Sequence, residues 1–184
     1  MAIVNGIEAN NIGKMVEEIK RSPASAQATF YANTNWNGGF HNEAEVGNFK
    51  LGGGMLKHAK TFKVVGDHPK ELLGTDKGPS SVEVLLAALG HCIASGWAVY
   101  GASMGIQVDS LKIEVEGDID LQGMLGLPEP GKVQPGYQNI RVTHVVKSKA
   151  PKDKLEQLMH MAEDLSPTRQ SLRAVSYSSK LISD

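Results

Sequence analysis

The chain contains one cysteine, Cys92, and a thiol is the side chain in this sequence best suited to nucleophilic or redox chemistry. A reactive thiol must be ionised, so its pKa has to be lowered by a helix N-terminus or a nearby cation. Composition alone favours a structural role, because free cysteine is among the most buried residue types. Any activation of Cys92 must therefore come from groups that the fold brings close to it.

Two titratable residues precede Cys92 in the same apolar stretch. His91 is adjacent, and at about 100° per helical residue it points away from the thiol, as expected for a hydrogen-bonded core histidine. Glu83 lies nine residues before Cys92, a rotation of roughly 900°, which places the two on opposite faces of one helix. Ser80 and Glu83 have the spacing of a capping box, which requires no chemistry. Glu83 and Cys92 can share a site if this helix pairs with that of a second copy.

Neither a hydrolase motif nor a metal-ligand pattern in this sequence indicates a catalytic site. Residues 101–105 match G-x-S-x-G, but a helix precedes them and a strand follows, which is the reverse of a nucleophile elbow. The six histidines show no metal-ligand spacing, and one cysteine excludes an internal disulfide framework and a multi-cysteine zinc site. We therefore expect no metal and no cofactor.

The thiol must be positioned by a long apolar helix. Between Val82 and Val99, 13 of 18 residues are apolar, and a helix that is apolar all round requires burial on every side. Glu83, His91 and two glycines within it favour a core helix over a membrane span. The net charge of −1 gives no electrostatic case for nucleic acid. The N-terminus lacks the pattern of a signal peptide, so we expect a cytoplasmic protein.

The residues before this helix predict one helix and a set of strands. An amphipathic helix is expected from about residue 7 to 22, as an arm docked on the body or on a partner. The alternation of apolar and polar residues, with Asn37-Gly38-Gly39 as a turn, predicts a β-hairpin. The expected segments are a strand over 26–36, a return strand over 40–49, a flexible connection over 50–55 and a short strand over 61–65.

The residues after the helix predict a second hairpin followed by two helices. Leu111, Ile113 and Val115 alternate with charged residues, the pattern of a half-buried strand. Proline suits the first turn of a helix, and serine followed by proline suits a helix start. The expected segments are strands over 106–121 and 140–146, a loop over 122–135, a helix from Pro151 with an apolar stripe through Leu165, a short helix over 166–172 and a strand over 175–181. This predicts one α+β domain with a mainly antiparallel sheet.

Several of these segments resemble the osmotically inducible protein C (OsmC) family, which includes the organic hydroperoxide resistance (Ohr) proteins. The resemblance rests on GTDKGP at 74–79, on Glu83 and LLAALGHC, and on PGYQNIRV followed by a helix and Ser166-Pro167. The N-terminal helix and the strand ending near Trp36 are similar to a longer-chain subgroup. The resemblance implies that residues 1–184 form one OsmC-like domain, with residues 1–24 as a helical arm. It also implies an intertwined homodimer, with mainly antiparallel sheets wrapped around long central helices and two sites at the interface.

The family's peroxidases use two cysteines together with an arginine and a glutamate. The reactive thiolate attacks the peroxide and becomes a sulfenic acid, and the second cysteine then forms a disulfide with it. By resemblance, Cys92 matches the reactive cysteine and Glu83 the glutamate. The position of the second cysteine is occupied by Ser166, and the chain has no arginine between Ser22 and Asn139. Arg169 could approach the site instead, as could one of the lysines at positions 50, 57, 60 and 63.

These departures leave two hypotheses for an OsmC-like protein. The first is an enzyme that reduces organic hydroperoxides in oxidative-stress defence through Cys92 alone, with an external thiol as reductant. Glu83 of the partner chain would orient the thiol, and Ser166, Arg169 and His91 would line the site. The second is a non-catalytic binder of a small hydrophobic ligand at the dimer interface. Without a nearby cation, we expect the pKa of Cys92 to lie near or above the ordinary value of about 8.5.

Overall fold

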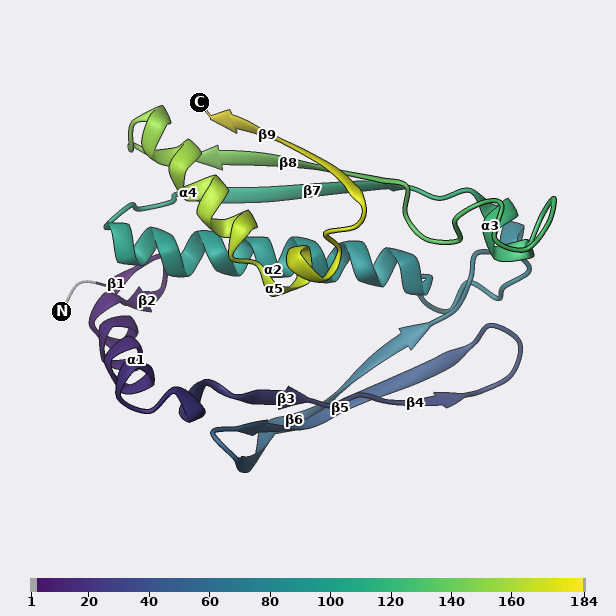
Figure 1. Ribbon diagram of the computed structural model, residues 1–184, viewed down its shortest axis with the longest axis horizontal. Helices are drawn as coiled ribbons and strands as arrows, with labels where there is room; N and C mark the ends of the chain where they lie inside the picture. Colours follow the sequence, from purple (N-terminus) through teal and green to yellow (C-terminus); the bar gives the residue numbers. More distant parts are fainter. Residues whose placement is uncertain (1–2, 184) are drawn as a thin grey trace. The chain divides into compact units, whose positions relative to one another are not determined.

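The structure is a computed structural model that describes residues 3–183 (Figure 1). The chain divides into two compact units. One consists of residues 11–85 and is called the N-terminal sheet unit. The other consists of the described residues up to 10 and from 86 onward, and is called the thiol unit because it contains Cys92. Each unit is described separately.

The N-terminal sheet unit is an antiparallel sheet built on one long hairpin. The strands β3 and β4 both pair with β5, which also pairs with β6. The elements are α1 (Ala9–Arg21), a 3₁₀ turn (Pro23–Ala26), β3 (Ala28–Phe30), β4 (Asn33–Trp36), β5 (Asn42–Leu51), β6 (Gly54–Gly66) and a second 3₁₀ turn (Lys70–Leu72).

Three predictions for this unit were wrong in detail. The strand expected over 26–36 is interrupted at Tyr31 and Ala32, between β3 and β4. The flexible connection expected over 50–55 is a two-residue hairpin turn, because Gly52 and Gly53 have φ values of 57° and 85°. The short strand expected over 61–65 is the end of β6. A hairpin with so short a turn needs no flexible segment.

The loop that contains the GTDKG motif is folded around Asp67. This carboxylate accepts hydrogen bonds from the backbone amides of His68, Thr75 and Lys77 and from the Thr75 hydroxyl. The Thr75 hydroxyl is the largest influence, and together these donors hold the pKa of Asp67 well below its usual range. Asp67 therefore fixes the path of the chain into the central helix.

The central helix, α2 (Ser81–Met104), begins at the predicted capping box. The backbone amide of Ser80 donates to Glu83 Oε2 at 2.8 Å and its hydroxyl donates to the same oxygen at 2.7 Å, which lowers the pKa of Glu83. Among the described residues, α2 is the one helix long and apolar enough to cross a membrane. Within the single chain, only 22% of its most apolar window is buried. Much of its apolar surface is therefore not buried within the single chain.

The thiol unit packs helices against a three-stranded sheet of order β7-β8-β9 (Figure 1). The pair β7–β8 is the predicted antiparallel hairpin, whereas β9 lies parallel to β8 because α4 and α5 form a crossover between them. The expected loop over 122–135 contains a short helix, α3, capped by Asp120. The elements are β1 (Ile3–Val4), β2 (Ile7–Glu8), β7 (Ser110–Asp118), α3 (Leu121–Leu125), β8 (Asn139–Lys147), α4 (Lys152–Asp164), α5 (Pro167–Ser171) and β9 (Ser176–Ser183).

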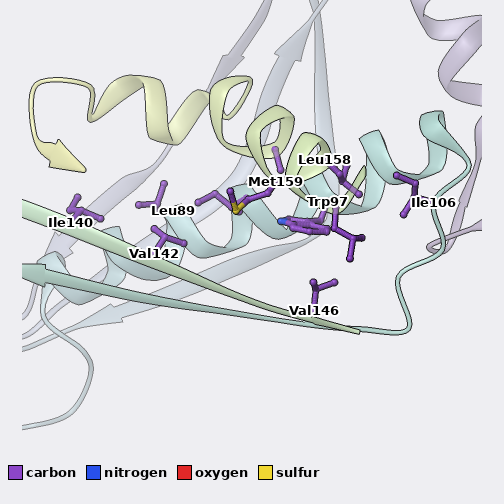
Figure 2. Close-up of a cluster of buried hydrophobic side chains, with 11 residues drawn as sticks. Leu89, Trp97, Ile106, Ile140, Val142, Val146, Leu158 and Met159 are labelled. Carbon is purple, nitrogen blue, oxygen red and sulfur yellow. The ribbon is translucent and has the colours of Figure 1, made fainter. Parts of the chain in front are cut away.

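The core of this unit lies between α2, α4 and β8 (Figure 2). Figure 2 shows Leu89 and Trp97 from α2 facing Leu158 and Met159 from α4, above the inward-facing residues of β8. Those β8 residues are Ile140, Val142 and Val146. The predicted apolar stripe of α4 is confirmed as far as Ala162. Leu165 was expected to continue it but is exposed, because α4 ends at Asp164. The mixed helix and sheet content confirms the predicted α+β class.

Candidate thiol site

A close crossing of α2 and α4 brings the site residues together. A Cβ atom on Gly96 would lie 2.9 Å from Ala162 Cα, so glycine is required for the two helices to approach this closely. Cys92 lies four residues before Gly96, and Ser166 lies four residues after Ala162. Four residues are about one helical turn, so on oppositely directed helices the two positions face each other. The Ser166 hydroxyl donates a hydrogen bond to Cys92 Sγ at 3.0 Å.

The orientation of the Ser166 hydroxyl is set by its role as the N-cap of α5. Its oxygen accepts a hydrogen bond from the backbone amide of Arg169 at 3.1 Å, as is usual for an N-cap serine. With its oxygen engaged as an acceptor, the hydroxyl hydrogen points to the sulfur. Ser166 is only 3% exposed, so little water competes for this bond. Ser166 is thus a polarising partner of the thiol.

The pKa of the Cys92 thiol is lowered, which overturns the expectation of a pKa near or above the ordinary value. Burial raises the pKa, but hydrogen bonds from the Ser166 hydroxyl and from the amide and hydroxyl of Thr168 outweigh it. These neutral donors stabilise the thiolate, as a nearby cation would have been expected to do. Thr168 was not identified from the sequence, although its place in the first turn of a helix begun by Ser166 implied a free backbone amide.

An apolar pocket of about 410 Å³ opens beside the sulfur. Its lining includes Cys92 and Ser166 together with mainly apolar groups from β2, α2 and the end of α4. Those groups are Ile7, Ser95, Gly96, Ala98, Val99, Tyr100, Ala162, Leu165 and Pro167. A larger hollow of about 770 Å³ at Pro151 and Lys154 is lined by neither cysteine nor histidine. The pocket at Cys92 is therefore the one that joins a polarised thiol to room for an apolar group.

The other predicted site residues lie elsewhere. His91 was expected to be a hydrogen-bonded core residue, but it is exposed, because its face of α2 is not covered within this chain. Glu83 caps α2 and belongs to the N-terminal sheet unit. The guanidinium of Arg169 lies over the ring of Tyr177, with its carbon 4.1 Å from the ring centre. Arg169 contributes its backbone amide to the Ser166 cap, while its charge is placed over an aromatic ring.

Glu163, which lies three residues before Ser166, is the centre of a buried polar network. The Glu163 carboxylate is 5% exposed and interacts with three side chains. Tyr177 donates to Oε1 at 2.8 Å, Ser179 donates to Oε2 at 3.0 Å, and His144 Nε2 lies 2.9 Å from Oε1. The indole nitrogen of Trp97 donates to His144 Nδ1 at 2.9 Å. Trp97 thus connects the network back to α2, the helix that contains Cys92.

The hydrogen-bond pattern assigns the protons of this network. Because Trp97 donates to Nδ1, the His144 ring carries its proton on Nε2 and donates it to Glu163. Burial alone raises the pKa of Glu163, but the bonds from His144, Tyr177 and Ser179 outweigh it, and the pKa is lowered. Burial and the bond to Glu163 raise the pKa of Tyr177. The network is a buried carboxylate that accepts hydrogen bonds from His144, Tyr177 and Ser179.

The network was not predicted from the sequence, although two residues indicated it. His144 lies between Val142 and Val146 on the inward face of β8, and Glu163 is one of the buried positions of α4. A polar side chain on a core face requires a buried partner. Identifying those partners requires the packing of α4 on β8 and β9, which the sequence pattern does not supply.

The fold and the site together define an α+β protein with one polarised thiol beside an apolar pocket. The sequence profile of the OsmC-like protein family matches residues 74–179, which is more than half of the chain. This protein therefore belongs to the OsmC-like family, as its motifs indicated. No curated protein matches its sequence.

Solved structures of the family share the fold at low sequence identity. The OsmC-like protein from Mycoplasma pneumoniae is 14% identical, with a TM-score of 0.65 over 84% of this chain and 96% of that chain. An organic hydroperoxide resistance protein OsmC from Legionella pneumophila is 16% identical, with a TM-score of 0.56 over 85% and 96%. The organic hydroperoxide resistance protein OhrB of Bacillus subtilis is 18% identical, with a TM-score of 0.50 over 83% and 98%. At these identities the likeness establishes the fold alone.

Proposed function

We propose that this protein is a cytoplasmic, thiol-dependent reductase of organic hydroperoxides that uses Cys92 alone. One observation supports the proposal above the others. The Ser166 hydroxyl donates to Cys92 Sγ at 3.0 Å at the edge of an apolar pocket, and the pKa of the thiol is lowered. A thiolate is the nucleophilic form of cysteine, and an apolar pocket suits the alkyl group of a hydroperoxide.

The reaction proceeds in two stages. The Cys92 thiolate attacks the outer peroxide oxygen, the O–O bond breaks, and the alkoxide leaves as an alcohol after taking up a proton. Cys92 becomes a sulfenic acid, and the substrate is reduced by two electrons. Ser166 cannot form a disulfide, so an external thiol attacks the sulfenic sulfur and releases water. A second thiol then displaces Cys92 from the mixed disulfide, which restores the thiolate.

The direct test is turnover of cumene hydroperoxide with dithiothreitol or dihydrolipoamide as reductant. Wild-type protein is expected to consume the peroxide, and Cys92→Ser is expected to abolish consumption, because serine cannot supply a thiolate. A matched control is Ser95→Ala. Ser95 lies in the same pocket, but its hydroxyl donates to the carbonyl of His91, so the substitution leaves the thiol intact. Equal turnover by wild type and Cys92→Ser would disprove the proposed activity.

The alternative is a non-catalytic binder of a small hydrophobic ligand. The observation that favours it is the predominantly apolar lining of the pocket, whose volume of about 410 Å³ lies in the usual range for small-molecule sites. If the protein is a binder, added cumyl alcohol would occupy the pocket and protect Cys92 from alkylation, and the protein would consume no hydroperoxide. The same assay therefore separates the two functions.

The proposal includes a homodimer, supported by the apolar surface that the single chain exposes. In the N-terminal sheet unit, Phe30 is 75% and Trp36 is 74% exposed. Only six of the 24 residues of α2 are buried. Large exposed apolar side chains in such numbers favour an interaction site. A second copy would cover it and could bring its Glu83 to Cys92.

Mixing two inactive variants tests the shared site. We expect Cys92→Ser and Glu83→Gln homodimers to be inactive alone and to regain turnover when refolded together. Each mixed dimer then holds one site with an intact Cys92 and an intact Glu83 from the other chain. Sedimentation should give twice the chain mass of 19.7 kDa. A monomer, or mixed dimers without turnover, would contradict the sharing of one site by two chains.

A further inference from the structure

The N-terminal hairpin forms one wall of the thiol pocket. The strands β1 and β2 pair with Val4 opposite Ile7, around a turn in which Asn5 and Gly6 have φ values of 53° and 77°. Asn-Gly is the preferred sequence for this tight turn. Ile7 lines the pocket beside Cys92, although 85 residues separate the two in the chain.

Asn5 fixes this hairpin on the segment that leaves α2. Its Nδ2 donates to the carbonyl of Ile106 at 2.9 Å, and its Oδ1 accepts from the amide of Val108 at 2.8 Å. The side-chain amide thus pairs with backbone on both of its polar ends. A Cβ atom on Gly101 would lie 2.6 Å from Asn5 Nδ2, so the last turn of α2 leaves room for this clamp.

We propose that Ile7 is a specificity-determining residue, which sets the size of the apolar group that can reach Cys92, and that Asn5 positions it. The inference rests on the proposed function for its substrate class, the alkyl hydroperoxides. Ile7 is a branched side chain on the pocket wall, and Asn5 prevents the hairpin from swinging away when a larger group enters. The intact wall therefore favours compact alkyl groups over bulky aromatic ones.

The test compares reagents of different bulk on the chain's one cysteine. Alkylation of Cys92 by iodoacetamide and by N-cyclohexylmaleimide is measured at one pH, and the ratio of the two rates is the readout. Ile7→Ala removes three carbon atoms and is expected to raise the relative rate of the bulky reagent about tenfold, the usual effect of a small change in an apolar pocket. Ile7→Phe is expected to lower it, and Asn5→Ala to raise it as Ile7→Ala does.

Ile3→Ala is the matched control, because Ile3 lies in the same hairpin, is 63% exposed and does not line the pocket. Its ratio should equal that of wild type. Equal ratios in Ile3→Ala, Ile7→Ala and Ile7→Phe would overturn the inference. The change in ratio does not depend on overall stability, since both reagents react with the same folded protein.

Hydroperoxides separate this inference from the proposed function. The kcat/KM ratio of cumene hydroperoxide to tert-butyl hydroperoxide should rise in Ile7→Ala. Altered alkylation ratios in the variants, without turnover of either peroxide by wild type, would support the role of Ile7 and disprove the proposed enzyme activity. Turnover with an unchanged peroxide ratio and unchanged alkylation ratios would support the enzyme and overturn the role of Ile7.

Discussion

Replacing Glu163 with alanine is expected to lower the free energy of unfolding by about 3–5 kcal/mol, a large share of the stability of an ordinary domain. The substitution leaves Tyr177, Ser179 and His144 Nε2–H without their acceptor in a buried site. A buried donor that loses its partner costs about 1–3 kcal/mol. The measurement is urea unfolding followed by circular dichroism.

Glu156→Ala is the matched control, because it makes the same change on the exposed face of the same helix, where Glu156 lies 3.9 Å from Lys152. Its unfolding midpoint should stay close to that of wild type. Glu163→Gln keeps an acceptor oxygen and the side-chain volume, so its midpoint should lie between those of Glu163→Ala and wild type. If Glu163→Ala unfolds with the midpoint of Glu156→Ala, the network does not stabilise the fold.

The same carboxylate gives the stability a defined pH dependence. The pKa of Glu163 in the folded state is lower than the ordinary value of 4.5. A depressed carboxyl pKa contributes stability that is fully present above the unfolded pKa and is lost as pH falls through the folded pKa. Wild type should therefore lose stability more steeply than Glu163→Gln as the pH falls below about 4.5. The comparison isolates Glu163, because His144, Tyr177 and Arg169 remain in both proteins.

Replacing Ser166 with alanine is expected to slow alkylation of Cys92 at pH 7 by at least about tenfold. A hydrogen bond to a charged group contributes about 1.5–3 kcal/mol, and about 1.4 kcal/mol corresponds to a factor of ten in the thiolate population. The pH at which alkylation reaches half its maximal rate should rise, because burial continues to raise the pKa of Cys92 when its strongest donor is lost. The measurement is the rate of iodoacetamide alkylation as a function of pH.

Three variants separate thiol activation from loss of the helix cap. Ser166→Thr keeps a hydroxyl and should restore the profile. Thr168→Val keeps the backbone amide and the cap, and should shift the profile in the same direction by less. Ser171→Ala removes a hydroxyl that bonds to the carbonyl of Pro167 in the same short helix, and it should change nothing. A Ser166→Ala profile that superimposes on wild type would show that Ser166 does not activate the thiol.

The elements around the site were largely predictable because local patterns encode them. The capping box at Ser80, the alternation of β7 and the apolar stripe of α4 each follow from a short stretch of residues, and the structure contains all three. The hairpin β5–β6 was misread because three successive glycines suggest flexibility as readily as a tight turn. The outcome was decided by pairing along the whole of β5, which is a tertiary effect.

The site itself was only partly predictable. Cys92 and Ser166 follow from motifs, but the direction of the thiol pKa depends on hydrogen bonds between residues 74 positions apart. The sequence indicated that a cation would be needed to lower the thiol pKa. Serine and threonine near a short helix are too common to indicate that neutral hydroxyl and amide donors lower it instead. Arg169 donates its backbone amide to Ser166, while its guanidinium stacks on Tyr177. The guanidinium can reach Tyr177 only because β9, which contains Tyr177, packs beside β8.

The crossover between β8 and β9 has a consequence for the newly made chain. The donors of the thiol lie in α5, within that crossover, and Ser166 follows Cys92 by 74 residues. At a synthesis rate of about 5–20 residues per second, Cys92 leaves the peptidyl-transferase centre roughly 4–15 seconds before its donors are made. The hairpin β7–β8 is local and can form in that interval, whereas the parallel pairing of β9 cannot. During synthesis Cys92 therefore lacks the hydrogen-bond donors that lower its pKa until α5 has been made and has packed beside α2.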